Sequence, residues 1–403
     1  MKIHRNVAFG IIDGLHQILK KNEAPRPYLN KLLKQNKKWG SRDRRQISEA
    51  ILDCIRWKRT YEYLGSFTAK SKNYYWELLG IWLLNKGLIF PDWDELSRLK
   101  DLKISLPLNP KTTARKIRES IPDWLDELGV KSFNETSWEK EIHALNSNAP
   151  LVLRCNTLKQ DPLKLQNYLK RDFKIEAARY NEIPEALIIE KHQKLNQNPL
   201  YKKGFFEIQD ANSQRVARWI DPQQGNLIVD SCAGSGGKSL HLAALMKNNG
   251  RIFALDTRPK KLDQLHKRAL RNGVTNIQTF MADNTEFYIK YQGVVDAVLI
   301  DAPCSGLGVI KRNPAAKWQM NPKKIGEFEK LQKEILIKNS ILVKKDGILV
   351  YATCSIFPNE NQLQISHFLK SKEGKRFKLV KDQTYLANET GFDGFYIAKL
   401  KKS

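Results

Sequence analysis

Two cysteines, Cys304 and Cys354, occupy short motifs that could supply a nucleophile. Cys304 ends the run Asp-Ala-Pro-Cys that starts at Asp301, and Cys354 follows Thr353, each directly after a predicted strand. A single buried cysteine is usually an inert small hydrophobe, so neither residue alone indicates chemistry. The two are too widely spaced for a CxxC redox motif, and no histidine cluster accompanies them for zinc. A thiol nucleophile is the interpretation that remains.

A glycine-rich loop, VDSCAGSGGKSL at residues 229–240, is a second candidate for chemistry. A Walker A loop would need a glycine where Cys232 stands, and a dinucleotide-binding loop would need one where Ser239 stands. A nucleotide hydrolase and a dehydrogenase are therefore disfavoured. The loop by itself leaves its ligand open.

Acidic residues follow the first three strands of the predicted sheet, at Asp230, Asp256 and Asp283. One such aspartate alone is commonly a helix cap. Here, however, the loop glycines let the backbone approach a ligand closely, and Asp256, about twenty residues further on, is placed to accept from ribose hydroxyls. The combined pattern favours an adenosine-containing ligand.

The charge of the chain favours a polyanionic partner. Among 403 residues, 69 Lys and Arg outweigh 43 Asp and Glu, which gives a formal net charge of +26. Cations that neutralise phosphates release counterions, so nucleic acid is favoured, although a solubilising surface would have the same composition. The five cysteines lack paired spacing, so we expect a reducing cytoplasm, no disulfide framework and no metal. No apolar run approaches the roughly 18 residues of a membrane span. We expect the protein to be a monomer.

Residues 206–403 alternate between short β-rich runs and segments of helical periodicity. The β-rich runs are NLIVD, RIFALD, IQTFMA, VVDAVLID and GILVYAT. This alternation is typical of an α/β fold with a mostly parallel sheet and helices on both faces, which binds ligands at the carboxyl ends of its strands. The thiols, the glycine loop and the aspartates all follow strands, so we expect them to meet at that edge.

Two smaller domains are expected before this sheet. Residues 1–105 have helical periodicity and no convincing strand, and residues 121–205 read as a small α+β unit of strand, helix and strand, with a second strand in EALIIEKH. In the helical region, Ile47, Ile51 and Ile55 form an apolar face. We expect the basic residues around them to lie on the outside: Arg42, Arg44, Arg45, Arg56, Lys58 and Arg59.

An adenosine ligand, a basic surface and a thiol together fit methylation of a pyrimidine carbon. Carbon 5 of cytosine becomes nucleophilic only after a thiolate adds at carbon 6 and forms an enamine, which can attack a sulfonium methyl group. An acid must hydrogen-bond ring nitrogen 3, and a base must remove the carbon 5 proton before the thiolate leaves. Asp301, next to the thiols, suits the acid or hydrogen-bonding role.

From about Asp123 to its end, the chain resembles the Sun-type (Fmu/RsmB-like) RNA cytosine-5 methyltransferases, which use S-adenosylmethionine. The resemblance is densest in FFEIQDANSQRVA, DSCAGSGGKS, DAPCSGLGVIKRNPAAKW, YATCSIFPNENQ and DGFYIAKLKK. The Pro-Cys-Ser and Thr-Cys-Ser motifs in this order are highly specific. The resemblance implies a Rossmann-like S-adenosylmethionine methyltransferase sheet over residues 206–403.

The resemblance also implies residue roles. Cys354 would attack carbon 6, and Cys304 would assist release of the methylated RNA. Asp301 would lie between cofactor and base, Asp256 would bind the ribose, and Asp283 would lie near the adenine. The glycine-loop residues would line the methionine end of S-adenosylmethionine: Cys232, Ala233, Gly234, Ser235, Gly236, Gly237 and Lys238.

Two departures from the family pattern concern the cofactor. The family loop more often reads Cys-Ala-Ala-Pro-Gly-Gly-Lys-Thr, whereas this chain has Gly234 and Ser235 in place of Ala-Pro and Ser239 in place of Thr. Proline would fix the loop backbone, and this chain lacks it there. Ala282 precedes Asp283 where family members often have glycine.

The N-terminal helices are similar to the NusB-like RNA-binding domain of bacterial family members that methylate 16S ribosomal RNA, most closely in SRDRRQISEAILDCIRWKRTYEYL. With an RNA-recognition-like unit at residues 121–205, this implies an enzyme that holds structured RNA by its phosphates and accepts a splayed-out cytosine. Cytosine-5 methylation of 16S ribosomal RNA is the expected activity. The alternatives are a transfer RNA, another ribosomal position, and a non-catalytic RNA-binding assembly factor.

Overall fold

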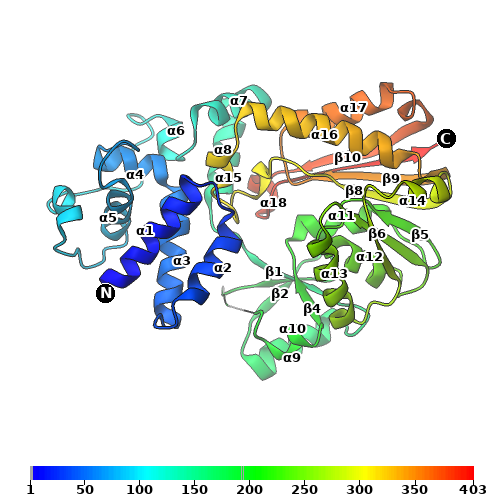
Figure 1. The fold of residues 1–403 in the computed structure, drawn as a ribbon, viewed down its shortest axis with the longest axis horizontal. Coiled ribbons are helices and arrows are strands. Elements are labelled where there is room, and N and C mark those ends of the chain that lie inside the picture. Colours follow the sequence, from blue (N-terminus) through cyan, green and yellow to red (C-terminus); the bar gives the residue numbers. More distant parts are fainter. Residues whose placement is uncertain (1–2, 192, 194) are drawn as a thin grey trace. The chain divides into compact units, whose positions relative to one another are not determined.

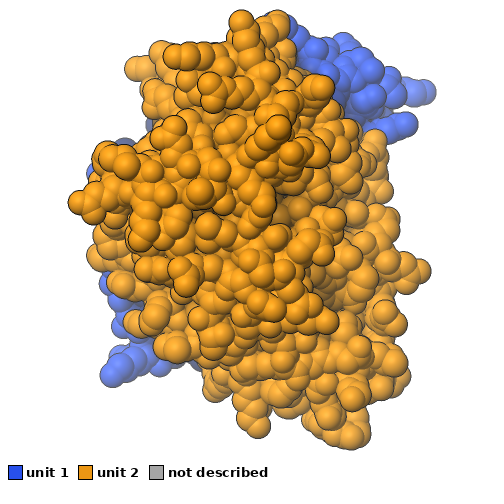
Figure 2. All heavy atoms as spheres, turned by 90° about the vertical axis from the view of Figure 1, so that its right-hand side faces the viewer, with its two compact units in different colours: residues 1–147, 310–322 blue, residues 148–309, 323–403 orange. Residues whose placement is uncertain are grey.

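The computed structural model describes residues 3–191, 193 and 195–403 of the chain. Its contacts divide the chain into two compact units, coloured separately in Figure 2. One unit comprises residues 1–147 and 310–322, and the other comprises residues 148–309 and 323–403. The segment 310–322 therefore belongs with the N-terminal helices, although it follows the Cys304 motif in the chain. The expected division at 1–105, 121–205 and 206–403 stays a prediction.

The first unit is helical throughout its regular elements (Figure 1). These elements are α1 (Arg5–Leu19), α2 (Pro25–Gln35), α3 (Ser41–Arg56), α4 (Lys58–Gly65), α5 (Tyr74–Asn85), η1 (Asp94–Leu99), α6 (Arg115–Arg118), α7 (Asp123–Phe133), α8 (Glu135–Asn146) and α15 (Ala316–Gln319). The apolar stripe of α3, at Ile47, Ile51 and Ile55, is fully buried. The helical spacing of these residues therefore predicts the core of the unit correctly.

Arg56 differs from the expectation, because the periodicity places it outside and the structure buries it. Its guanidinium donates to the carbonyl oxygens of Asn146 at 3.1 Å and Lys311 at 2.8 Å. Lys317 is also buried, and its Nζ donates to the Arg56 carbonyl and to Asn146 Oδ1, each at 2.8 Å. These bonds satisfy otherwise unpaired carbonyls and hold the segment 310–322 to the helices.

The second unit contains a four-stranded antiparallel sheet in the order β2-β3-β1-β4. Its elements are β1 (Leu151–Cys155), α9 (Pro162–Phe173), β2 (Ala177–Arg179), β3 (Ala186–Ile189), α10 (Pro199–Lys202) and β4 (Phe206–Ile208). The predicted strand, helix and strand correspond to β1, α9 and β3, while His192, at the end of the run EALIIEKH, lies outside the described residues. β2 and β4 span three residues each, too few for a visible alternation.

The larger sheet of this unit has seven strands in the order β10-β11-β9-β8-β5-β6-β7. The strands are β5 (Leu227–Asp230), β6 (Arg251–Asp256), β7 (Ile277–Met281), β8 (Val295–Asp301), β9 (Val343–Thr353), β10 (Phe377–Tyr385) and β11 (Phe395–Lys402). The five predicted strands are β5 to β9, and they pair in parallel. The sequence pattern did not predict the last two strands; β11 pairs antiparallel with β9, and β10 pairs antiparallel with β11.

Helices cover both faces of the larger sheet (Figure 1). One face is covered by α11 (Ala211–Ile220), α12 (Gly237–Leu245) and α13 (Pro259–Asn272). The other is covered by α14 (Thr285–Tyr291), α16 (Pro322–Ser340) and α17 (Gln362–Lys370). The remaining short elements are η2 (Leu307–Val309), η3 (Pro358–Glu360), η4 (Gly374–Arg376) and α18 (Ala387–Thr390). None of the described helices is long and apolar enough to cross a membrane.

The order of the strands reverses beside β5. β6 and β7 lie on one side of β5, whereas β8 and β9, which follow in the chain, lie on the other. In doubly wound sheets, loops diverge at such a reversal and leave a crevice beyond the carboxyl ends of the strands. The fold therefore places Asp230, at the end of β5, and Asp301, at the end of β8, on either side of the position expected for a ligand.

A buried polar cluster connects the small sheet to helices α11 and α12. Glu185, just before β3, accepts a hydrogen bond from His241 Nε2 at 2.9 Å. Arg218 Nη1 donates to both Glu185 oxygens, at 2.9 and 3.0 Å. Burial, helped by the charge of Arg154, lowers the pKa of His241 to about 4, so the imidazole is neutral at pH 7. The neutral ring can donate to the Glu185 carboxylate, whose pKa falls to about 2 because the hydrogen bond with His241 and the charge of Arg218 outweigh the effect of burial.

This cluster predicts that the unfolding free energy falls as the pH falls from about 6.5 to about 4. The folded pKa of His241 lies below its unfolded value, so the unfolded chain takes up the proton first and is stabilised at low pH. The full effect is on the order of 3 kcal/mol. Urea unfolding of the native chain and of His241→Gln at several pH values tests this, because the variant lacks the titrating ring. An equal pH dependence in both proteins would contradict the assignment.

Candidate active site

The glycine loop between β5 and α12 has a backbone conformation that requires glycine at two positions. Gly234 and Gly236 have φ angles of 54° and 86°, in the left-handed region that favours glycine. A Cβ at position 236 would lie 2.6 Å from Leu265 Cγ. The Ser231 amide donates to the Leu299 carbonyl of β8 at 2.9 Å. The Ala233 amide donates to the Leu255 carbonyl of β6 at 2.8 Å. The loop thus stays close to the edge of the sheet.

A cavity of about 940 Å³ lies beside this loop. Most of the predicted cofactor residues line it: Cys232, Ala233, Gly234, Ser235, Gly237, Lys238, Asp256 and Asp301. Gly236 and Asp283 are not among the lining residues, and Asp283 is exposed. Its neighbour Ala282 lines the cavity instead. The adenine role that the resemblance gives to Asp283 stays a prediction.

Two aspartates face the cavity from the ends of β5 and β6. Asp256 accepts from the Gly234 amide and from the Arg258 amide, each at 2.9 Å. Asp230 Oδ2 accepts from the Ser239 hydroxyl at 2.6 Å, while its Oδ1 has no partner among the described residues. Burial raises the pKa of Asp230 to about 7, and the charge of Asp301 acts in the same direction. A buried oxygen without a partner at a cavity wall fits a ligand that carries a hydrogen-bond donor.

Lys238 and Asp301 form an ion pair at the wall of the cavity. Lys238 Nζ lies 2.6 Å from Asp301 Oδ2, and the lysine side chain is 10% exposed against 31% for the aspartate. Lys238 lies on the first turn of α12, and Asp301 ends β8. The pair joins the glycine loop to the strand that leads into the Cys304 motif, and it leaves Asp301 accessible from the cavity.

The structure brings Cys304 and Cys354 together, with their Sγ atoms 3.3 Å apart. The hydrogen bond with Cys354, together with burial, raises the pKa of the Cys304 thiol well above its usual range. Cys304 therefore keeps its proton and can donate it toward Cys354. Cys232 is different, because burial raises its pKa to about 12 with no second thiol beside it. It forms part of the cavity wall.

Polar residues behind the two thiol motifs hold them in place, and the sequence did not single them out. The carboxylate of Glu360 is fully buried and accepts from the Ser305 amide at 2.8 Å and from the Ser305 hydroxyl at 2.5 Å. Asn361 accepts from the Thr353 hydroxyl at 2.6 Å and donates to the Ser355 carbonyl at 2.9 Å. Both residues lie in the quoted run YATCSIFPNENQ, whose polar Asn-Glu-Asn ending was the available signal.

A close approach of two glycines fixes the backbone beside Cys354. The Gly308 amide donates to the Cys354 carbonyl at 2.9 Å, and the Gly394 amide donates to the Gly308 carbonyl at 2.7 Å. A Cβ at position 308 would lie 2.3 Å from the Gly394 oxygen and 2.8 Å from the Cys354 oxygen. Only glycine allows this contact between the Cys304 loop, the Cys354 loop and the loop before β11.

Fold and site together define the class of the protein. A doubly wound sheet with a glycine-loop cavity at its strand reversal is the architecture of the Rossmann-like methyltransferases, and the cofactor of this class is S-adenosylmethionine. Residues 217–401 match the family described as 16S rRNA methyltransferase RsmB/F, and residues 121–196 match the ferredoxin-like domain of the same methyltransferases. The chain belongs to the RsmB/F family of 16S rRNA methyltransferases.

Curated relatives support this membership. The probable ribosomal RNA small subunit methyltransferase B of Synechocystis sp. is 35% identical over 300 residues, which cover 70% of this chain and 67% of that protein. The ribosomal RNA small subunit methyltransferase B of Escherichia coli is 31% identical over 325 residues, which cover 79% of this chain and 73% of that protein. The match to each relative thus leaves part of the relative's own length uncovered.

Solved structures have the same fold. PH0851 superposes with a TM-score of 0.81 at 24% identity, over 100% of both chains. NSun6 from Pyrococcus horikoshii, solved with an S-adenosylmethionine analogue, superposes with a TM-score of 0.64 at 21% identity, over 70% of this chain and 98% of that one. Within residues 3–191, 193 and 195–403, no group of three or more His, Cys, Asp or Glu could hold a metal ion.

The glycine contact beside Cys354 yields a prediction. Gly308→Ala should lower the unfolding free energy by about 1–3 kcal/mol, because its Cβ would push the Cys354 loop away from the loop before β11. Methyl transfer should fall about 100-fold, since small misplacements of reacting groups are costly. Urea unfolding and a tritiated methyl-transfer assay measure the two effects. Gly326→Ala on α16 is the control, because a Cβ there meets no atom within 4 Å; a Gly308→Ala variant that behaves like this control would contradict the prediction.

Proposed function

We propose that this protein methylates carbon 5 of a cytosine in RNA through a covalent bond between Cys354 and carbon 6. The observation that carries the proposal is the 3.3 Å contact between two thiols at the carboxyl ends of β8 and β9. Thiol addition is the chemistry that makes a pyrimidine carbon nucleophilic. Family membership supports ribosomal RNA as the substrate, and 16S ribosomal RNA is the specific RNA that we propose.

The cofactor residues fit S-adenosylmethionine. The glycine loop allows close backbone approach, and Asp256 at the end of β6 suits the ribose hydroxyls. Asp230, with its unpartnered Oδ1 at the cavity wall, and Lys238 suit the polar amino-acid end. When bound, the cofactor supplies an electrophilic methyl group. The role of Asp283 at the adenine is the part of this assignment with the least support, because Asp283 does not line the cavity.

The thiols take different roles in the proposed reaction. Cys304 keeps its proton and lies 3.3 Å from Cys354, which leaves Cys354 as the attacking thiol. Asp301 in its protonated form donates to nitrogen 3 of the cytosine ring as Cys354 adds, and its contact with Lys238 holds the side chain in position. After methyl transfer the carbon 5 proton must leave before the Cys354 bond breaks. We assign Cys304 to this release: its thiol donates a proton to the departing Cys354 sulfur, while a separate base takes the carbon 5 proton.

RNA binding is proposed for the basic surface and the helical N-terminal region. Phosphate contacts would position a structured RNA, and the site would take one base out of its stack. The NusB-like resemblance of the first helices supports such a role. A reducing cytoplasm is the compartment that we propose, because all five cysteines are free thiols. A transfer RNA and another ribosomal position are the alternative substrates.

Cys354→Ala should abolish methyl transfer to RNA, because the neighbouring thiol, Cys304, keeps its proton and does not attack carbon 6. Initial rates with tritiated S-adenosylmethionine and 16S ribosomal RNA measure the loss. Cys155→Ala is the matched control, since that cysteine lies in the core of the small sheet. Retained activity in Cys354→Ala would overturn the nucleophile assignment.

Cys304→Ala should leave RNA attached to the protein through Cys354, because addition can proceed while release fails. The adduct would appear as a slower band on a denaturing gel, and Cys304→Ala combined with Cys354→Ala should lack it. Absence of the band in the single variant, under conditions where the native protein transfers methyl groups, would count against the release role.

Deleting the gene should remove one 5-methylcytosine from 16S ribosomal RNA. Bisulfite sequencing of total RNA from cells with and without the gene identifies the position, and a copy encoding Cys354→Ala should fail to restore it. Loss of a site in transfer RNA instead would favour the alternative substrate. An unchanged methylation pattern together with absent S-adenosylmethionine binding would favour a non-catalytic assembly factor.

A further inference from the structure

The glycine loop lacks its own source of rigidity. Position 235 is serine, where the family pattern that the chain resembles more often has proline. Its neighbour Gly234 is in the left-handed region, with nothing within 4 Å of a built Cβ. Glycine has the largest conformational freedom of any residue, and proline would restrict φ. A loop that must present its backbone to a cofactor therefore needs support from outside itself.

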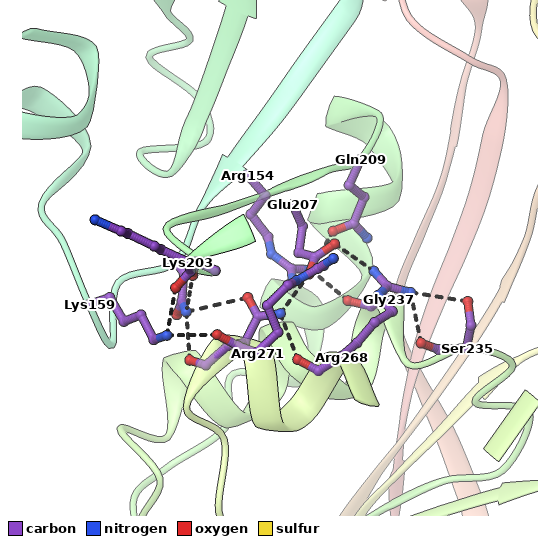
Figure 3. Close-up of polar contacts among 12 residues, drawn as sticks. Arg154, Lys159, Lys203, Glu207, Gln209, Ser235, Gly237, Arg268 and Arg271 are labelled. Carbon is purple, nitrogen blue, oxygen red and sulfur yellow. Dashed lines mark hydrogen bonds and ion pairs between the residues drawn. The ribbon is translucent and has the colours of Figure 1, made fainter. Parts of the chain in front are cut away.

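Two arginines donate hydrogen bonds to the loop (Figure 3), and one of them, Arg268, also lines the cavity. Arg268, on α13, donates from one guanidinium nitrogen to the Ser235 carbonyl at 2.7 Å and to the Ser235 hydroxyl at 3.0 Å. Arg154, on β1, donates to the Gly237 carbonyl at 2.6 Å. The serine hydroxyl accepts a bond that a proline at the same position could not make.

Glu207 fixes the position of Arg268. Its Oε2 accepts from the other terminal nitrogen of Arg268 at 2.9 Å, and its side chain is 3% exposed. Its Oε1 accepts from Arg271 and, at 2.6 Å, from Asn272. Figure 3 shows Arg268 extended between Glu207 and the loop residue Ser235. A buried carboxylate with three donors holds a guanidinium in one geometry.

Glu207 and Arg154 come from neighbouring strands of the small sheet. They are direct partners in the antiparallel register of β1 and β4. From this one pair, Arg154 reaches Gly237 directly and Glu207 reaches Ser235 through Arg268. The small sheet thus contacts the Gly237 carbonyl directly and supports the Ser235 carbonyl through Arg268, although the sequence separates Glu207 from Ser235 by the whole of α11 and β5.

We propose that Arg268, held by Glu207, is a positioning residue that substitutes for the missing loop proline and sets the affinity for S-adenosylmethionine. The inference rests on the proposed placement of the cofactor at the glycine loop. Arg268 acts on the loop backbone through Ser235. Proline at position 235 should therefore make the arginine dispensable.

Calorimetric titration of the full chain with S-adenosylmethionine tests this proposal. Arg268→Gln should raise the Kd about tenfold, as expected for loss of charge-assisted hydrogen bonds, with kcat at saturating cofactor within about threefold of the native value. Arg271→Gln is the matched control, because Arg271 lies on the same helix and binds the same Glu207 without reaching the loop. Its Kd should stay within about threefold. Adding Ser235→Pro to Arg268→Gln should restore the native Kd.

Three outcomes would overturn the proposal. The first is an unchanged Kd in Arg268→Gln, and the second is an equal rise of the Kd in Arg271→Gln. The third is a double variant whose Kd stays high, which would mean that Arg268 contacts the cofactor directly from the cavity wall. If Arg268→Gln fails to fold by urea unfolding, Ser235→Ala decides instead. That variant loses the 3.0 Å bond and should raise the Kd about threefold, and an unchanged value would refute the proposal. A native chain that binds no S-adenosylmethionine would overturn the cofactor placement, which is a separate failure.

Discussion

The site depends on the parallel pairing of β8 with β9. In their register Asp301 lies opposite Ala352, and the Ala302 amide donates to the Ala352 carbonyl at 2.8 Å. Cys304 follows its strand by three residues and Cys354 follows its own by one, so a fixed register brings two thiols separated by 50 residues to 3.3 Å. A shift by one residue would turn the flanking side chains to the opposite face of the sheet.

Around this pairing, the site is built from short side-chain contacts that come from behind the reacting groups. Glu360 holds the Cys304 motif, and the Gly308 backbone holds the Cys354 carbonyl. Lys238 joins the glycine loop to Asp301. Because each of these contacts is buried or half-buried, the arrangement is preorganised, which is what acid-base and nucleophilic chemistry requires.

The small sheet also supports the cofactor side of the proposed site. Through Glu207 and Arg154 it reaches the loop that we assign to the cofactor, and through Glu185 it reaches helix α12 behind that loop. A domain proposed to recognise RNA therefore shares its buried charges with the cofactor side of the site. Buried charges are costly unless paired, so these contacts define one arrangement of the two sheets rather than a range.

The sequence by itself determined the helical N-terminal region, the five parallel strands and the two thiol motifs, because local periodicity and specific motifs are visible within a few residues. The residues that follow the strands favour an adenosine-containing ligand, and the resemblance of the motifs to a known family implies S-adenosylmethionine. Only the tertiary structure decided that Cys304 and Cys354 touch, that Asp283 does not line the cavity, that Arg56 is buried, and that Ser235 is held by Arg268. Such facts depend on contacts between residues far apart in the chain. No local pattern records those contacts, because a side chain's partner is set by packing and by the need to pair buried polar groups.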